Sequence, residues 1–361
     1  MADSISFARG APSLDIVDVE GLKAAANAAF ERDPGGTTAY GTSVGYVPLR
    51  RWIAEKHGVA EAQVIVTNGS MQADAFLFDT LVKEGDAVIV ERPTYDRTLL
   101  GLRERGADIR MVELQQDGID TVALTALLDK GLRPSLAHII PNFQNPAGYT
   151  LSLNKRKALL ELSSKHGFTL FEDDPYIDIR FTGEPLPTML SMNDGGARVV
   201  YASSFSKTVC PGIRCGYLVG PEDLIAQIVR RATNTYISPD MVAQSIVYDF
   251  CASGRIDQSI ATVKEALKER CRALTTALAR DLPEASFSAP EGGYFMWIEM
   301  PGGTSVDALF DAAAQRGVQI VKGTDFLLEG GENTFRIAYS GVTPDQIDEG
   351  VKRLAEAYNS L

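Results

Sequence analysis

The stretch "VVYASSFSKTVCPGIRCGY" (residues 199–217) joins a strand-like run to a loop that carries one lysine and one arginine. Its first residues are β-branched or aromatic, which is typical of a buried strand. Serines follow, then Lys207, and Arg214 stands seven residues further on in a segment with Gly and Pro. Most lysines in such a position are solvated loop residues. The rest of the chain has to indicate whether Lys207 has a chemical function.

Similar apolar runs recur through the middle of the chain and alternate with helix-like segments. This alternation is typical of βα units around a mainly parallel sheet. After about residue 220 a long helical region follows, broken near Ser238 and Pro239, and then strands and helices of an α+β type. We therefore expect a three-layer α/β/α large domain with a mainly parallel seven-stranded sheet, plus a smaller α+β domain. The predicted strands of the large sheet include 63–67, 86–93, 136–143, 168–173, 198–204 and 215–220.

The composition excludes several classes of protein. The chain has 361 residues and a formal net charge of −12, so it lacks the basic surface that nucleic-acid binding requires. No apolar window is long enough for a membrane span, and the N-terminus does not resemble a secretory signal. The four cysteines show no CxxC spacing and the three histidines are scattered. We expect a cytoplasmic protein with reduced thiols and no metal site.

Polar or ionisable residues follow five of the predicted strands, at the point where each strand ends. Ligands of open α/β sheets bind outside the carboxyl ends of the strands. Each residue alone has an ordinary explanation, such as a turn, a helix cap or a core aromatic. Five such strand ends along one edge of a sheet predict a pocket. The residues are Gly69, Ser70, Tyr95, Asn145, Asp173, Tyr176, Ser204 and Lys207.

These residue types suit a phosphorylated, cationic ring that carries an aldehyde. Ser70 and the free N–H groups of the helix behind it would bind a phosphate, completed by Ser204 and Arg214. Asp173, a carboxylate that is costly to bury unless it meets a cation, would hold a protonated ring nitrogen. Lys207, desolvated and close to cations, would have a lowered pKa and form an imine.

Three further side chains complete the predicted site. Asn145 and Tyr176 would donate hydrogen bonds to a ring phenolate oxygen, and Tyr95 would stack on the face of the ring. A phosphorylated, cationic pyridine with an aldehyde is pyridoxal 5′-phosphate (PLP). We therefore predict PLP as the cofactor.

At this point the sequence resembles the fold-type I PLP-dependent enzymes. More narrowly, it resembles the class I/II aminotransferase family, in the branch with 2-aminoadipate and kynurenine aminotransferases and the catalytic-like domain of MocR regulators. The resemblance covers nearly the whole chain, and the order NPAG, DDPY, SFSKxxxPGxRxG is specific although each short motif is weak. The matching segments are "YGTSVGYVPLRRWIA" (40–54), "TNGSMQADAF" (67–76), "RPTYD" (92–96), "PNFQNPAGYTLS" (141–152), "EDDPYIDIRF" (172–181), "SSFSKTVCPGIRCGYLVG" (203–220), "EGGYFMWIEMP" (291–301) and "FRIAYS" (335–340).

The resemblance also implies a role for each site residue. Lys207 would form the Schiff base and shuttle protons, with Asp173 and Tyr176 as the other catalytic residues. Gly10, Asn145 and Arg336 would bind the substrate, with Arg336 on its α-carboxylate. The implied cofactor-binding set is Gly69, Ser70, Met71, Tyr95, Asn145, Asp173, Tyr176, Ser204, Lys207 and Arg214, together with Tyr40, which would reach the phosphate in the neighbouring subunit of a homodimer.

The resemblance further implies three segments. Residues 1–35 would pack on the small domain and the active site, residues 36–245 would form the large PLP-binding domain, and residues 246–361 the small domain. Two positions depart from the family pattern: Met71 stands where relatives carry Gln, and Lys322 stands where they carry Pro. These departures affect substrate choice rather than cofactor binding.

The expected reaction is ping-pong transamination from an L-α-amino acid of 2-aminoadipate, aromatic or branched aliphatic type to a 2-oxo acid such as 2-oxoglutarate. The same residues would serve a β-lyase, a decarboxylase or an amino-acid oxidase, which would release ammonia without an acceptor or consume oxygen. A ligand-sensing regulator is the alternative from another class. Such regulators carry a basic DNA-binding domain ahead of this fold, whereas here the family pattern begins within the first dozen residues of an acidic chain.

Overall fold

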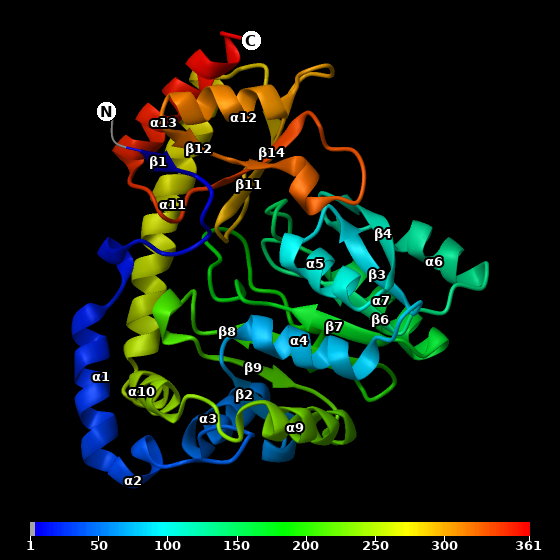
Figure 1. Cartoon of the computed structure of the whole chain (residues 1–361), viewed down its shortest axis with the longest axis vertical. Coiled ribbons are helices and arrows are strands. Elements are labelled where there is room, and N and C mark those ends of the chain that lie inside the picture. The colour runs from blue at the N-terminus through cyan, green and yellow to red at the C-terminus, as the bar shows by residue number, and fades with distance from the viewer. Residues whose placement is uncertain (1–3) are drawn as a thin grey trace.

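The computed structural model describes residues 4–361, so residues 1–3 of the predicted N-terminal segment lie outside the described residues. Its largest sheet has eight strands and extends through the middle and lower part of the molecule in Figure 1. In spatial order the strands are β2 (Val64–Thr67), β9 (Gly216–Val219), β8 (Arg198–Ser204), β7 (Thr169–Asp173), β6 (Leu136–Ile139), β3 (Ala87–Arg92), β4 (Asp108–Gln115) and β5 (Gly118–Ile119).

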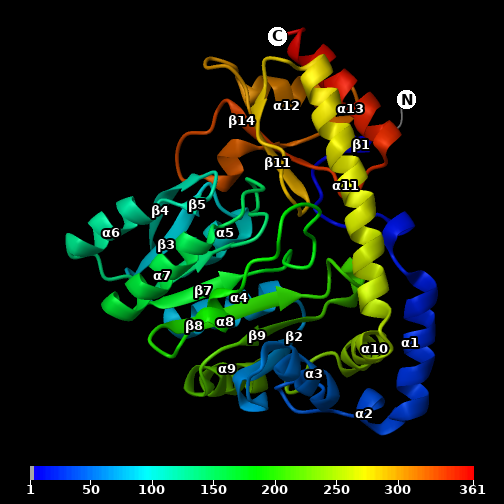
Figure 2. The ribbon, with the colours of Figure 1, turned by 180° about the vertical axis from the view of Figure 1, so that it is seen from behind.

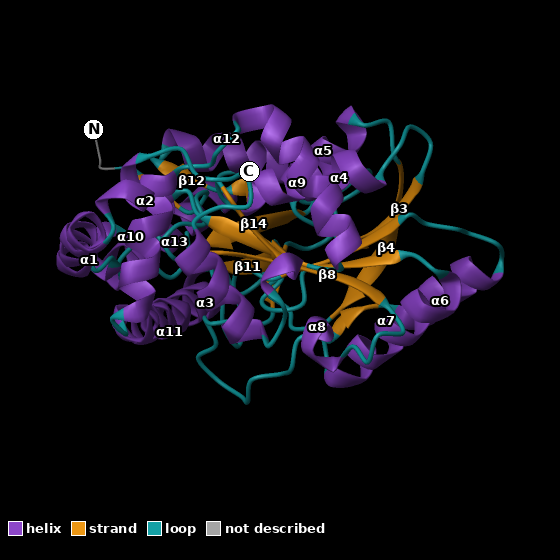
Figure 3. Cartoon of the chain, turned by 90° about the horizontal axis from the view of Figure 1, so that it is seen from below, coloured by secondary structure: helices purple, strands orange, loops and turns teal. Residues whose placement is uncertain are grey.

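Helices cover both faces of this sheet, so the predicted three-layer α/β/α arrangement is confirmed (Figure 3). Four neighbouring strand pairs, from β4 through β3, β6 and β7 to β8, are parallel. Strand β9 is antiparallel to β2 and β8, and β5 is antiparallel to β4. One face carries α4 (Ser70–Leu81), α5 (Asp96–Glu104) and α9 (Glu222–Tyr236); the other carries α3 (Val47–His57), α6 (Thr121–Asp129), α7 (Leu153–His166) and α8 (Met189–Met192).

The sheet contains one strand more than the predicted seven, because the two-residue β5 extends its edge. The preceding edge strand β4 reads "DIRMVELQ" and was not predicted as a strand. Only one of its eight residues is buried, so it carries charged residues and lacks a continuous apolar run. The inner strands β6 and β7 are buried at every residue, which is why they are apolar and easily recognised.

A second, four-stranded sheet forms the upper part of the molecule in Figures 1 and 2, with α11 running up beside it from the large sheet. Its strands in spatial order are β10 (Ser286–Phe287), β11 (Phe295–Glu299), β14 (Thr334–Ala338) and β13 (Val321–Lys322). The long helical region is divided into α9, α10 (Met241–Ala252) and α11 (Arg255–Asp281). The predicted break at Ser238 and Pro239 is present, and a second break occurs at Gly254, which has a φ of 78° that glycine adopts readily.

Two more helices complete this upper part, α12 (Val306–Gln315) and α13 (Pro344–Tyr358). Helix α13 begins as its sequence predicts, because the side chain of Thr343 accepts from Gln346 N and the Gln346 side chain accepts from Thr343 N. None of the helices within residues 4–361 is long and apolar enough to cross a lipid bilayer.

The N-terminal segment contacts both parts of the molecule. Its first strand, β1 (Ile5–Ser6), pairs in parallel with β12 (Val318–Gln319), and Phe7 O accepts from Ala338 N in β14. Helices α1 (Val19–Arg32) and α2 (Pro34–Thr38) then descend along α10, as the blue ribbon in Figure 1 shows. The segment between β1 and α1 therefore passes close to the edge of the large sheet where the strands end.

Candidate active site

A cavity of about 140 Å³ lies at the carboxyl ends of the parallel strands, beside the first turn of α4. Each of the five predicted strand ends contributes to its lining. The residues that surround it are Ser70, Met71, Asp74, Tyr95, Ile140, Asn145, Asp173, Pro175, Tyr176, Ser204, Ser206, Lys207 and Arg214. The structure thus brings together most of the predicted site residues from distant parts of the chain.

Lys207 lies in the turn that follows β8, and its Nζ enters the cavity. The ammonium donates a hydrogen bond of 2.6 Å to the backbone oxygen of Gly10. It also lies 5.6 Å and 5.2 Å from the ring centroids of Tyr176 and Tyr294, within the range of cation–π attraction. The Tyr294 hydroxyl donates to the backbone oxygen of Lys207, which holds the turn in place.

The surroundings of this lysine favour its neutral form. Burial is the largest cause, and the charges of Arg336 and Arg214 act in the same direction, so that the pKa of Lys207 falls to about 8. Asp173 opposes this shift. Because an exposed lysine has a pKa near 10.4, a much larger fraction of this amine is uncharged and nucleophilic close to neutral pH.

Asp173 is the last residue of β7 and is 5% exposed. Its Oδ2 lies 3.2 Å from Nε2 of His138, a fully buried residue of the neighbouring strand β6. Its Oδ1 is also buried, and no described residue donates a hydrogen bond to it. A buried carboxylate oxygen without a donor is costly, so this oxygen suits a cationic N–H group in the cavity.

The first turn of α4 forms one wall of the cavity. The helix begins at Ser70 directly after Gly69, which supplies no side-chain cap and has a φ of 88°. A Cβ on Gly69 would lie 2.3 Å from Arg214 Nη2, and a Cβ on Gly216 would lie 2.5 Å from Ser70 N. Glycine at both positions lets the backbone and the guanidinium approach each other closely. The result is a concave group of donors at a helix N-terminus, which suits a phosphate.

Two serines extend this wall from β8. The Ser204 hydroxyl donates to Cys215 O at 3.3 Å and accepts from Ser206 N at 3.1 Å. Arg214 donates through Nη1 to the Ser206 hydroxyl and to Pro211 O, each at 3.3 Å. These contacts use one nitrogen of the guanidinium, so its other donors remain for an anion at the α4 wall.

Asn145, Tyr176 and Tyr95 line the remaining sides. Asn145 and Tyr176 are each 4% exposed. Burial raises the pKa of Tyr95 to about 12 and raises the pKa of Tyr176 well above its ordinary value. Both phenols therefore stay protonated near neutral pH and can donate hydrogen bonds.

Arg336, in β14, lies behind Asn145 rather than in the lining of the cavity. Its Nη1 donates to Asn145 Oδ1 at 2.8 Å and its Nη2 to the backbone oxygen of Ala8 at 2.6 Å. The guanidinium lies between two aromatic rings, 4.4 Å from the centroid of Phe295 and 4.9 Å from that of Phe326. Its Nε is buried and has no partner among the described residues.

Gly10 stands at the same place on the N-terminal segment. A Cβ at this position would lie 2.2 Å from the ring of Phe295, so a larger residue would displace the segment or the ring. The backbone oxygens of Ala8 and Gly10 thus accept hydrogen bonds from Arg336 and Lys207 respectively. The N-terminal segment lies directly over the predicted substrate contacts.

Three predicted positions lie away from the cavity centre. Tyr40 is 88% exposed and is not part of the cavity lining of its own chain. Met71 is at the rim, where its Sδ lies 3.9 Å from the Tyr95 hydroxyl. Lys322 is also outside the cavity and pairs with Asp307 at 2.8 Å. Met71 is therefore the departure from the family pattern that borders the site.

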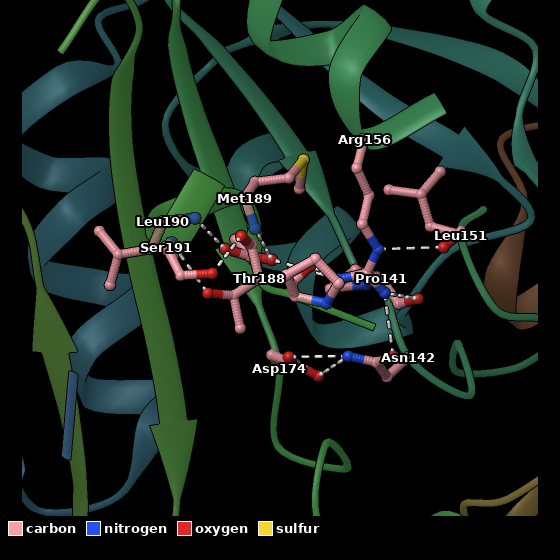
Figure 4. Close-up of polar contacts among 11 residues, drawn as sticks. Pro141, Asn142, Leu151, Arg156, Asp174, Thr188, Met189, Leu190 and Ser191 are labelled. Carbon is pink, nitrogen blue, oxygen red and sulfur yellow. Dashed lines mark hydrogen bonds and ion pairs between the residues drawn. The ribbon is translucent and has the colours of Figure 1, made fainter. Parts of the chain in front are cut away.

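A buried polar network fixes the strand ends that carry the site (Figure 4). The Arg156 guanidinium is fully buried and donates to Asn142 Oδ1 at 2.9 Å. The Asn142 amide donates in turn to both oxygens of Asp174, at 3.0 Å and 2.9 Å. Asn142 follows β6 and Asp174 follows β7. The network therefore holds the segments that bear Asn145 and Asp173 at a constant separation. Arg156 also donates to the backbone oxygens of Leu151, Pro187 and Pro141.

Sequence reasoning did not identify two residues of the site, His138 and Asp74. His138 interrupts the apolar run of β6, and Asp74 occupies a buried position of α4 beside Ala73 and Phe76. A single polar residue on a buried face was the available signal in both cases, because burial without a partner is costly. It was insufficient to show what either residue contacts, since Asp173 and His138 are 35 positions apart.

The residues present fit the predicted cofactor. The buried, unpartnered Asp173 Oδ1 accounts for a ring N–H group, and the glycine-lined wall of α4 accounts for a phosphate. The lysine with the lowered pKa borders the same cavity as both. These three features match the three functional groups of PLP.

Comparison with known proteins agrees with this chemistry. Residues 2–354 match the family described as "Aminotransferase class I and II". The chain is 32% identical to the 2-aminoadipate transaminase of Thermus thermophilus, over 99% of this chain and 90% of the relative. It is 30% identical to aromatic-amino-acid aminotransferase 1 of Thermococcus litoralis, over 98% of this chain and 88% of the relative.

A solved structure shows the same likeness in three dimensions. The α-aminoadipate aminotransferase of Thermus thermophilus, solved in complex with N-(5′-phosphopyridoxyl)-L-leucine, superposes with a TM-score of 0.94 and 32% sequence identity. The match covers 99% of this chain and 92% of that structure.

Proposed function

The chain belongs to the class I and II aminotransferases, which use PLP, and we propose that it transfers the amino group of an L-α-amino acid to 2-oxoglutarate by a ping-pong mechanism. The proposed donors are 2-aminoadipate and aromatic or branched aliphatic amino acids. The names of the two similar enzymes support the first two classes, and the leucine adduct bound to the similar structure supports the third.

This proposal rests mainly on Lys207, which lines the cavity and whose amine has a lowered pKa. Its neutral Nζ would bind the aldehyde carbon of the cofactor and, once displaced by the substrate amine, would take the proton from the substrate Cα. The bound cofactor supplies an electron-withdrawing ring that makes this Cα proton acidic. Burial, together with the charges of Arg336 and Arg214, lowers the pKa of this amine, so that a larger fraction of Nζ is neutral than in an exposed lysine.

Asp173 would hold the protonated ring nitrogen through the oxygen that lacks a partner. His138 Nε2 lies 3.2 Å from the other oxygen, Oδ2, and Oδ1 has no hydrogen-bond partner among the described residues. Asn145 and Tyr176 would donate to the ring oxygen, and Tyr95 would stack on the ring. At the opposite end of the cavity, the phosphate would be held by Gly69, Ser70, Met71, Ser204 and Arg214.

Arg336 would bind the α-carboxylate of the substrate. A guanidinium has five N–H groups, of which two are engaged by Asn145 and Ala8. The Nε–H and two further N–H groups remain, enough for a bidentate contact with a carboxylate. A substrate carboxylate that displaced Ala8 O from Arg336 would also shift Gly10 O, which accepts from Lys207. The N-terminal segment would then move as the substrate enters.

Tyr40 would act in a second copy of the chain. Its side chain is 88% exposed and is not part of the cavity lining of its own chain, so it is available to a neighbouring subunit. We therefore propose a homodimer in which each Tyr40 reaches the partner's phosphate site. Light scattering that gives about the monomer mass of 39.0 kDa at working concentration would exclude this arrangement.

Borohydride reduction followed by peptide mapping tests the central assignment. The wild-type protein should carry the reduced cofactor on Lys207, and Lys207→Ala should lose both the adduct and all turnover. Lys165→Ala, on an exposed lysine, is the matched control and should keep both. A reduced adduct elsewhere in the chain, or turnover in Lys207→Ala, would remove the proposed role.

A panel of amino acids with 2-oxoglutarate tests the reaction type and the donors. Formation of glutamate and of the matching 2-oxo acid in equal amounts supports transamination. Ammonia release without an acceptor, or oxygen consumption, would show instead a lyase or an oxidase on the same fold.

A further inference from the structure

Asp74 is a buried carboxyl group in the cavity that none of the roles above uses. It lies on α4, one turn after Ser70, and is 8% exposed. Its Oδ1 is buried, and no hydrogen bond to it comes from the part of the chain that the structure describes. A buried carboxylate without a partner is strongly disfavoured. The carboxyl is therefore either protonated or made for a cation that binds in the cavity.

Asp74 and Asp173 line the same cavity, and each lacks a hydrogen-bond donor among residues 4–361 for one of its carboxyl oxygens, the buried Oδ1. Burial raises the pKa of Asp74 well above its ordinary value, and the negative charge of Asp173 raises it further. Asp74 is therefore the member of the pair that keeps a proton in this poorly solvated site.

Within the described structure, neither carboxyl forms a direct ion pair with a lysine or an arginine. On its outer side Asp74 borders a second cavity of about 270 Å³, where Arg97 of α5 and Arg105, directly after α5, also lie. Arg105 is paired with Asp79 at 2.6 Å and Arg97 with Asp96 at 3.4 Å. The charged and titratable groups around Asp74 are Asp173 on β7, His138 on β6 behind it, Tyr95, Arg97, Glu104 and Arg105 on or beside α5, and Tyr176, Lys207 and Arg214 in the cavity lining.

We propose that Asp74 and Asp173 act as a carboxyl pair that retains one proton in the cofactor-free protein and loses it when the cationic ring of PLP binds. This inference rests on the proposed role of Asp173 as the partner of the ring nitrogen. The ring brings a positive charge to both carboxyls, so the ionised form of each is stabilised. Asp74 is then a further cofactor-binding residue rather than a buried defect of α4.

The proton has a defined fate. If the ring nitrogen arrives protonated, the proton of the pair passes to solvent; if it arrives neutral, the proton passes to the nitrogen. We compare the wild-type protein with a variant in which Asp74 cannot ionise. On binding PLP, the wild type releases up to one proton more in the first case and takes up as much as one proton fewer in the second. The pKa of the pair is lower in the bound state. PLP affinity relative to that variant therefore rises with pH between the bound and free pKa values, by at most about tenfold per pH unit.

Calorimetric titration of PLP into the cofactor-free chain, in two buffers of different ionisation enthalpy, counts the protons. Asp74→Asn, which keeps the shape of the side chain, should lose up to one released proton and the corresponding pH dependence of affinity. Asp129→Asn, the same change at an exposed position of α6 that lines neither cavity, should behave as the wild type. Equal proton counts in Asp74→Asn and the wild type would overturn the proposal.

A second measurement needs no variant. Infrared difference spectra of the wild-type protein should show a protonated carboxyl band that disappears when PLP is added. A spectrum without this loss would also overturn the proposal, even if Asp74→Asn failed to fold. If the wild-type protein does not bind PLP at all, the proposed function fails instead, so the two failures are distinguishable.

Discussion

Replacement of Arg336 separates recognition of the substrate carboxylate from every other function of the site. A hydrogen bond to a charged group contributes about 1.5–3 kcal/mol, so a bidentate contact with a carboxylate contributes about 3–6 kcal/mol. Arg336→Met removes both bonds. Since about 1.4 kcal/mol corresponds to tenfold in rate, we expect kcat/KM for an L-amino acid to fall by about two to four orders of magnitude. Arg336→Lys retains the charge and one bond, and should lose about 10- to 150-fold.

The assay compares two amines in the first half-reaction, followed by the absorbance of the bound cofactor. One is L-2-aminoadipate, and the other is 5-aminopentanoate, which lacks the α-carboxylate but is otherwise the same molecule. Wild-type protein should prefer the amino acid strongly, and Arg336→Met should lose most of this preference. Because Arg336 also holds Asn145 Oδ1 and Ala8 O, the affinity for PLP is measured in parallel as a control for local disorder.

Two results would refute the reasoning about Arg336. In the first, Arg336→Met discriminates between the two amines as well as the wild type does, so the carboxylate is bound elsewhere. In the second, the variant loses both amines and PLP together, and Arg336 then acts only by holding Asn145 and the N-terminal segment. A loss confined to the amino acid is the expected outcome.

The remaining predictions concern titration, the ring nitrogen and stability. Because the pKa of Lys207 is lowered to about 8, the rate of PLP uptake by the cofactor-free protein should rise with pH up to about 8 and then level off; a rate that still climbs near pH 10 would show an ordinary lysine. Asp173→Asn should cut turnover by about two orders of magnitude or more while the phosphate still binds, as judged by competition between PLP and inorganic phosphate; near-normal turnover would remove its role. Arg156→Met leaves the buried Glu172 carboxylate without its ion-pair partner at 3.7 Å and should cost about 3–5 kcal/mol in denaturant unfolding, whereas a loss below about 1 kcal/mol would show that the network in Figure 4 adapts.

The fold class and most of the site were predictable from local sequence. Inner strands such as β7 are buried on both faces, so their residues form apolar runs that end abruptly at polar side chains such as Asp173. The order of those strand ends along the chain then identified the residues that line the cavity. The edge strand β4 was missed for the same physical reason, since a half-exposed strand does not need an apolar run.

Some properties of the protein depend on neighbours in the chain and can be inferred from local sequence: where elements begin and end, and which chemical groups stand at the strand ends. Which of these groups contact one another depends on the folding of the whole chain. Arg336 donates to Asn145 across 191 positions, and Lys207 to Gly10 across 197. Such contacts depend on the sum of many weak packing interactions over the whole core. No periodic pattern in the sequence predicts them. The presence of Asp74 and Asp173 in one cavity is a contact of this kind, which is why local sequence does not indicate a role for Asp74.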